Sequence, residues 1–210
     1  MPCDSENKKS DVMADMLFAN WHSSCAYNQA TPLDIPEPLK ITNQEHNTMK
    51  NQTTLENLQR ALAMELTAAH QYQLHAGILS DWGLDRLAAK MREEMQEELG
   101  HSDNFMDRII FLKGEPKLEL AKTPMVAGSL AEMFEADLDD EKEAIEFYTK
   151  AARQAADDAD IGTRKIFEHI VIDEEGHMSW LELQLDLISR MDEANYIAKH
   201  VSAPGEGENS

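Results

Sequence analysis

Two long stretches without proline are the strongest constraint on how this chain can fold. Residues 39–115 contain 77 positions without proline, and residues 125–203 contain 79. Proline is excluded from helix interiors, so each stretch has room for a pair of helices. The alternation of apolar and polar residues that is typical of β-strands is absent. The pattern predicts an all-α fold in which residues 114–128 connect two helical pairs.

Helical spacing of apolar residues and capping signals divide the two stretches into individual helices. The first helix is expected to start at Thr53, which forms a capping box with Glu56. The expected helices are 53–81, 84–114, one beginning at residue 129, 160–191 and a short one near 192–200. Together they predict a four-helix bundle with a long crossover and a short C-terminal fifth helix.

This bundle is expected to span residues 51–203. Residues 1–50 are expected to be an extension, either mostly disordered or a docking arm for a protein partner, and residues 204–210 a disordered tail. An amphipathic stretch around residues 12–21 supports the docking interpretation. Deleting residues 1–45 is then expected to leave the chemistry of the bundle intact. His22 and Cys25 have the spacing of half a metal site, but no other ligands stand near them.

Six polar side chains occupy positions where the helical rhythm calls for leucine or isoleucine. They are Glu65, Glu98, His101, Glu141, Glu174 and His177. A buried carboxylate must be neutralised, paired or bound to metal, because removing its charge from water is costly. No lysines lie near enough in these layers to pair with four glutamates. The alternative is an acidic face that merely looks inward.

The six residues form two copies of one set. Adding 76 to the numbers of Glu65, Glu98 and His101 gives the other three. Residues three apart on a helix face the same way, so each Glu-x-x-His pair presents both side chains to one point. Four carboxylates and two neutral imidazoles carry a charge of −4, which two divalent cations neutralise. Carboxylate-rich sites with imidazole favour iron or manganese.

Two further acids precede the histidines by four residues. Glu97 lies before His101, and Asp173 lies before His177. Each either accepts the free ring N–H of that histidine or is an ordinary solvated acid. His75, His169 and His200 fall away from the seams of the bundle and are expected to be partly exposed or at interfaces.

Charge and cysteine content limit the classes of binding partner and the cellular compartment that we expect. The chain has 40 acidic and 19 basic residues, a formal charge of −21, which disfavours nucleic acid and favours cations. It has no apolar run long enough for a membrane span, and we expect neither a secretory leader nor a membrane partner. Its two cysteines both lie in the first 25 residues, which is consistent with the reducing cytoplasm.

The body of the chain resembles bacterioferritin, within the ferritin-like superfamily. The resemblance rests on MELTAAHQYQLHAGILSDWGLDRLAAKM, HSDNFMDRIIFLKGEPKL, DEEGHMSWLELQLDLISRM and NYIAKH. It implies that the six residues bind two iron ions per subunit, with Glu98 and Glu174 as the bridging pair and Tyr72 beside the centre. It also implies a shell of 24 subunits that oxidises Fe²⁺ with O₂ or H₂O₂ and stores ferric mineral.

One position departs from the family pattern. Bacterioferritins usually read Glu-Met-x-His, and that methionine binds haem b at a twofold interface, whereas this chain has Leu99 there. Leucine has no donor atom, so we expect a homopolymer without haem. Met95 or His70 could bind haem instead, but we expect Met95 to be a packing residue and His70 an interface residue. A shell mixed with a haem-binding sister subunit is another alternative.

Two other classes of function remain open from the sequence. One is a discrete di-iron or dimanganese peroxidase or oxidase on the same bundle. The other is an interaction protein whose extension recruits a partner. The number of subunits in the native particle distinguishes storage from the discrete enzyme.

Overall fold

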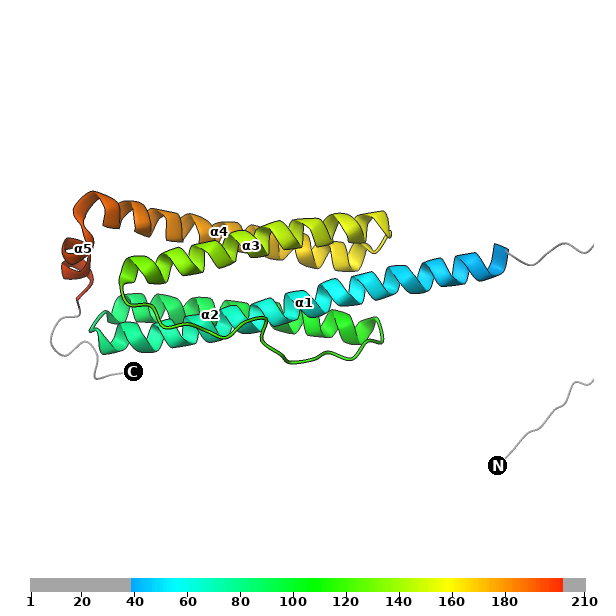
Figure 1. Cartoon of the computed structure of the whole chain (residues 1–210), viewed down its shortest axis with the longest axis horizontal. Helices are drawn as coiled ribbons and strands as arrows, with labels where there is room; N and C mark the ends of the chain where they lie inside the picture. Colours follow the sequence, from blue (N-terminus) through cyan, green and yellow to red (C-terminus); the bar gives the residue numbers. More distant parts are fainter. Residues whose placement is uncertain (1–38, 202–210) are drawn as a thin grey trace, which may run out of the picture. The chain divides into compact units, whose positions relative to one another are not determined.

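The computed structural model of this chain describes the backbone of residues 39–201 and the side chains of residues 52–201. These residues form five helices and no strand (Figure 1). The helices are α1 (Leu39–Asp81), α2 (Asp85–Phe111), α3 (Leu130–Asp157), α4 (Ile161–Met191) and α5 (Glu193–His200). The predicted all-α bundle with a short fifth helix is confirmed. Among these helices, none has the length and apolar character needed to cross a membrane.

Several predictions concern residues outside this range. The amphipathic stretch at 12–21, the His22–Cys25 spacing and the tail at 204–210 all lie outside the described residues.

The predicted limits of two helices were wrong. Helix α1 begins at Leu39 instead of Thr53, because residues 39–52 contain neither glycine nor proline to stop the helix. Helix α2 ends at Phe111, short of Gly114. Lys113 there adopts a φ of 65°, a left-handed conformation that terminates a helix.

The crossover runs the length of the bundle beside α1, so that α1 pairs with α2 and α3 pairs with α4 (Figure 1). Side chains of α1 form hydrogen bonds with the backbone of the crossover at three points. Gln59 bonds to Lys117, Thr67 to Ala121 and Gln71 to Met125. These hydrogen bonds span 2.6–2.8 Å. The crossover is therefore a fixed strap along α1.

Side chains cap the remaining helices. The Ser129 hydroxyl accepts a hydrogen bond from the Glu132 N–H at 3.2 Å, as the sequence predicted for the start of α3. The Asp160 carboxylate accepts from the Thr163 N–H at 3.0 Å and starts α4. The Glu193 carboxylate, on α5, accepts from the first two N–H groups of α3 at 3.1 and 3.2 Å. The short fifth helix thus fixes the start of the third.

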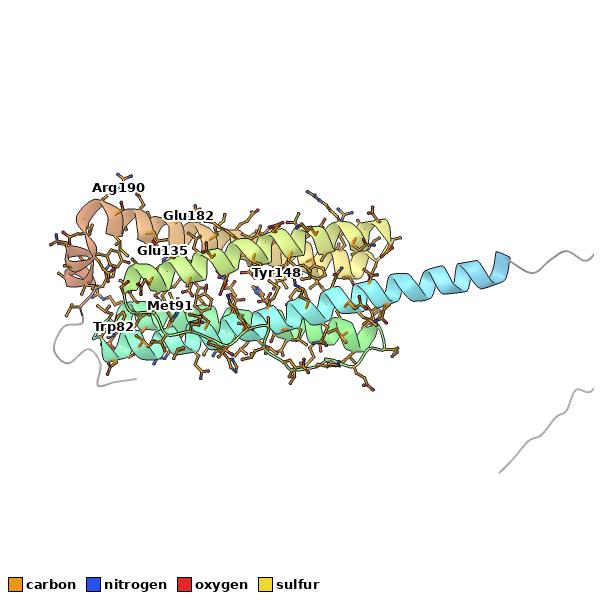
Figure 2. All side chains as sticks on the ribbon, viewed as in Figure 1. Trp82, Met91, Glu135, Tyr148, Glu182 and Arg190 are labelled. Atoms are coloured by element: carbon orange, nitrogen blue, oxygen red, sulfur yellow. The ribbon has the colours of Figure 1, made fainter. Side chains whose placement is uncertain are left out.

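The core has two apolar layers. The layer near α5 includes Leu79, Met91 and Phe134, and the layer at the other end includes Leu62 and Phe167, all at most 1% exposed. Figure 2 shows Met91 inside the bundle toward the α5 end. Between these two layers lies a polar one.

Candidate metal centre

The polar layer contains all six side chains that the sequence singled out. Helix α1 contributes Glu65, α2 contributes Glu98 and His101, α3 contributes Glu141, and α4 contributes Glu174 and His177. Each is at most 7% exposed. Helical periodicity places these side chains on the inner face of each helix, so four distant segments of the sequence meet at one level.

His101 points one ring nitrogen into the cluster. Its Nδ1 lies 3.2 Å from Glu98 Oε2, 3.5 Å from Glu174 Oε1 and 3.6 Å from Glu65 Oε2. Burial alone lowers the pKa of His101, but hydrogen bonds to these three carboxylates outweigh it and raise that pKa. Without a metal ion, His101 is therefore held as the cation that partly balances the acids.

His177 also points its Nδ1 into the cluster, from the opposite side. Its Nδ1 lies 3.0 Å from Glu174 Oε2, 3.2 Å from Glu98 Oε1 and 3.8 Å from Glu141 Oε1. The two imidazole rings are 6.5 Å apart between centroids. Both histidines thus direct Nδ1 toward a shared pair of carboxylates.

The donors fall into two overlapping groups, each with its atoms within 4.8 Å of one another. One group contains Glu65, Glu98, His101 and Glu174, and the other contains Glu98, Glu141, Glu174 and His177. Glu98 and Glu174 belong to both, which is the arrangement expected of carboxylates that bridge two ions. The geometry is therefore that of two adjacent cation positions with two shared ligands.

Buried atoms without hydrogen-bond partners test whether the cluster fits metal. Among the described residues, Glu98 Oε1, Glu174 Oε2 and His177 Nδ1 lack such a partner although all three are buried. Burial and the Glu98 charge raise the pKa of Glu65 to about 8. Burial likewise raises the pKa of Glu141, with the charges of Glu174 and Glu98 adding to it. Buried ligand atoms without partners, and carboxyls that keep their protons because their charges are crowded together, are what a dimetal site shows before cations replace those protons.

The outward nitrogen of each histidine meets an acid of the opposite helix. His101 Nε2 lies 3.4 Å from Asp173 Oδ2, whereas His177 Nε2 lies 3.0 Å from Glu94 Oε2 and 3.6 Å from Glu97 Oε2. Asp173 and Glu97 therefore lie beside outward ring nitrogens, as one of the two predicted alternatives had it, but the nearer ring belongs to the opposite helix, because α2 and α4 face each other. Sequence analysis missed Glu94, which is 3% exposed and paired with Lys90.

Two buried tyrosines touch the cluster. The Tyr72 hydroxyl donates a hydrogen bond to Glu141, and the Tyr148 hydroxyl donates one to Glu65 at 2.5 Å. The structure therefore places Tyr72 beside the centre, where the resemblance located it. Tyr148 was not among the residues that the sequence singled out.

Of the other histidines, His75 is buried and His169 is exposed. His75 was expected to be partly exposed or at an interface, and this is wrong, because it is 1% exposed inside the single subunit and its Nδ1 lies 3.0 Å from Asp137 Oδ2. Asp137 stands in the seam of α3, and this acid provides the partner that allows an imidazole to be buried. The side chain of His169 is 72% exposed, as expected.

A cavity of about 280 Å³ leads to the cluster from beneath the crossover. All four glutamates of the two cation positions line it. Lys122 and Asp140, which form an ion pair, line its outer part together with Thr67. The centre is thus buried yet has a route toward the surface.

Comparisons with known proteins agree with this geometry. The ferritin-like domain family matches residues 55–191. Bacterioferritin of Brucella melitensis is 41% identical over 143 residues, 68% of this chain and 88% of that protein. Bacterioferritin of Rhodobacter capsulatus is 41% identical over 137 residues, 65% of this chain and 85% of that protein.

A solved structure extends the agreement to three dimensions. It is the Rhodobacter capsulatus bacterioferritin with a metal-free dinuclear site and haem iron in a crystallographic special position. It superposes with a TM-score of 0.71 at 37% identity, covering 73% of this chain and 96% of that one. Similarity in sequence, fold and the buried carboxylate–histidine layer together show that this chain belongs to the bacterioferritins, within the ferritin-like family.

Proposed function

We propose that this protein stores iron and acts as a ferroxidase, with Fe²⁺ as its substrate. The observation that supports this best is the pair of overlapping donor groups sharing Glu98 and Glu174. Two ferrous ions bound there supply two electrons, the number that converts O₂ to H₂O₂ or H₂O₂ to water. Either oxidant is compatible with the proposal.

The chain's own side chains account for the preference for oxidation. Four carboxylates stabilise Fe³⁺ more than Fe²⁺, because the added charge is met by anionic oxygens in a site with little water. The outward Nε2 atoms of the two histidines lie 3.4 Å from Asp173 Oδ2 and 3.0 Å from Glu94 Oε2, which leaves each Nδ1 directed toward the iron positions. The cavity beneath the crossover gives Fe²⁺ a path to these donors.

We propose further that 24 subunits assemble into a hollow shell in the cytoplasm. Support comes from the family, and from large apolar side chains left exposed on the single subunit, such as Phe111, Met125 and Val126 at 67–73% exposure. A net charge of −21 would draw cations toward such a shell.

We also propose that the homopolymer contains no haem at residue 99. Leu99 has no donor atom, and Met95 is engaged in packing against the apolar layer near α5. Leu99→Met should restore a donor and produce a Soret band in protein expressed with added haem. A Soret band in the wild type, stoichiometric with twofold sites, would contradict the proposal.

Native mass spectrometry of iron-loaded full-length protein tests function and assembly together. We expect a particle of 24 subunits with at least two iron ions per subunit. A monomer or dimer that turns over peroxide would favour the discrete enzyme instead.

Glu98→Ala tests the site. It should reduce the initial rate of Fe²⁺ oxidation by about 100-fold, because both cation positions lose a ligand. Glu182→Ala is the matched control, since Glu182 is exposed on α4 and lies on the outer side of the bundle (Figure 2). Equal rates for the wild type and both variants would refute the proposed ferroxidase site.

A further inference from the structure

Tyr148 is a buried polar residue with no role in the function proposed above. It is 1% exposed on α3 and lies in the middle of the bundle (Figure 2). Its hydroxyl donates a hydrogen bond of 2.5 Å to Glu65 Oε1, and Glu65 is a candidate ligand on α1. The contact therefore ties the third helix to a donor of the first.

The internal repeat of the chain relates this contact to another one. The step of 76 residues that carries Glu65 to Glu141 also carries Tyr72 to Tyr148. Tyr72 on α1 donates to Glu141 on α3, and Tyr148 on α3 donates to Glu65 on α1. Each tyrosine thus reaches across the bundle to the lone glutamate of the other half.

We infer that Tyr148 is a second positioning tyrosine of the metal centre, which orients Glu65 for one cation as Tyr72 orients Glu141 for the other. The inference rests on the proposed function, because it assumes that both positions are filled. Glu65 belongs to the donor group with His101, and Glu141 to the group with His177. Each cation position therefore has a tyrosine of its own.

The surroundings of Tyr148 suit a fixed hydrogen-bond donor. Its ring packs at centroid distances of 5.6 Å from Phe105 and 5.7 Å from both Phe147 and Phe167, which restrict its rotation. A donor locked in this way holds one oxygen of Glu65 and leaves the other free to face an ion.

Tyr148→Phe isolates the hydroxyl, because phenylalanine keeps the ring and its packing. The probe is Co²⁺, which has the charge of Fe²⁺ but is not oxidised by air under these conditions. Crystals of full-length protein soaked at subsaturating Co²⁺ would report occupancy at each position by anomalous scattering, and titration in solution would report both affinities.

We expect Tyr148→Phe to weaken binding at the Glu65–His101 position by roughly 10-fold and to leave the Glu141–His177 position nearly unchanged. Tyr72→Phe should give the reverse pattern. Tyr196→Phe is the matched control, since that buried hydroxyl bonds to Gln184 near α5 at 2.8 Å and should alter neither position.

Two results would overturn the inference. One is equal occupancy of both positions in Tyr148→Phe, and the other is an equal loss at both, which would indicate a general structural role. A thermodynamic cycle provides the second measurement: in a Glu65→Gln background, Tyr148→Phe should cause no further loss of Co²⁺ affinity. Failure of the proposed function is distinguishable, because the wild type would then bind no pair of Co²⁺ ions at all.

Discussion

The apolar ends of the bundle and its polar middle follow opposite rules. At the ends, residues such as Phe134 and Phe167 are fully buried against other apolar side chains. In the middle, carboxylates and imidazoles are equally buried, yet Glu98, Glu174 and His177 each leave an atom without a hydrogen-bond partner. Apolar burial stabilises a fold, whereas unsatisfied buried polar groups destabilise it.

The difference shows that one set of helices has separate regions for stability and for binding. The two ends hold the four helices in register, and this rigidity keeps like charges together that would otherwise separate. Burial, and after it the nearby charge of Glu98, raises the pKa of Glu65 to about 8 in this layer. We expect the middle to gain stability when cations bind, so that stability and the proposed function belong to different layers.

The largest expected effect is at an apolar end. Phe134→Ala should lower the free energy of unfolding of the metal-free protein by about 3–5 kcal/mol, because it removes a fully buried ring that also contacts Trp180. Chemical denaturation of the metal-free protein measures it. Glu182→Ala is the control, because Glu182 is an exposed polar residue on the outer side of α4 (Figure 2).

A change in the middle should behave in the opposite way. Glu174→Gln should weaken binding of both cations by about 100-fold, because both positions share that carboxylate. It should change the melting temperature of the metal-free protein much less than Phe134→Ala does, since glutamine keeps the shape of the side chain and still offers a carbonyl oxygen to the histidines. A large fall in that melting temperature would break the distinction between the layers.

Raising the pH should strengthen cation binding. The proton on Glu65 must leave before a cation binds, and its pKa of about 8 places this competition in the range up to pH 8. Affinity for Co²⁺ should therefore increase roughly 10-fold per pH unit for each proton released, between about pH 5 and 8. Calorimetry in buffers of different ionisation enthalpy counts the protons.

The same pKa values predict a trend without metal. A group whose pKa is raised by folding stabilises the native state at low pH and loses that contribution as pH rises through the raised value. The melting temperature of the metal-free protein should therefore fall between about pH 5 and 8, and the increase caused by Co²⁺ should widen. A rising melting temperature without metal would contradict the raised pKa of Glu65 and Glu141.

The smallest effect is expected at the border of the polar layer. Glu94→Gln keeps the shape of a side chain that contacts His177 Nε2 at 3.0 Å but removes its charge. Affinity at the His177 position should fall by about 10-fold or less, because the imidazole becomes a weaker donor. Glu93→Gln, at an exposed neighbouring position, is the control. Similar losses in both variants would show that only overall charge matters.

Periodicity and repetition were enough to predict the six candidate ligands. Glu65 and Glu141 stand at core positions of their own helices, and that property can be read from the neighbouring residues alone. The same step of 76 also connects Tyr72 to Tyr148, so the repeat points to the second tyrosine as well. Helix limits were less predictable, because a capping box such as Thr53–Glu56 also occurs inside a continuous helix.

The sequence by itself determined the helical class, the two pairs of helices and the polar residues that face inward. These depend on spacing within one helix, which the chain encodes locally. Only the tertiary structure decided that Asp173 lies beside His101, that Glu94 lies beside His177 and that Tyr148 donates a hydrogen bond to Glu65. Such pairings depend on how far each helix is rotated and shifted against its neighbour, and that setting results from packing of the apolar layers of all four helices at once.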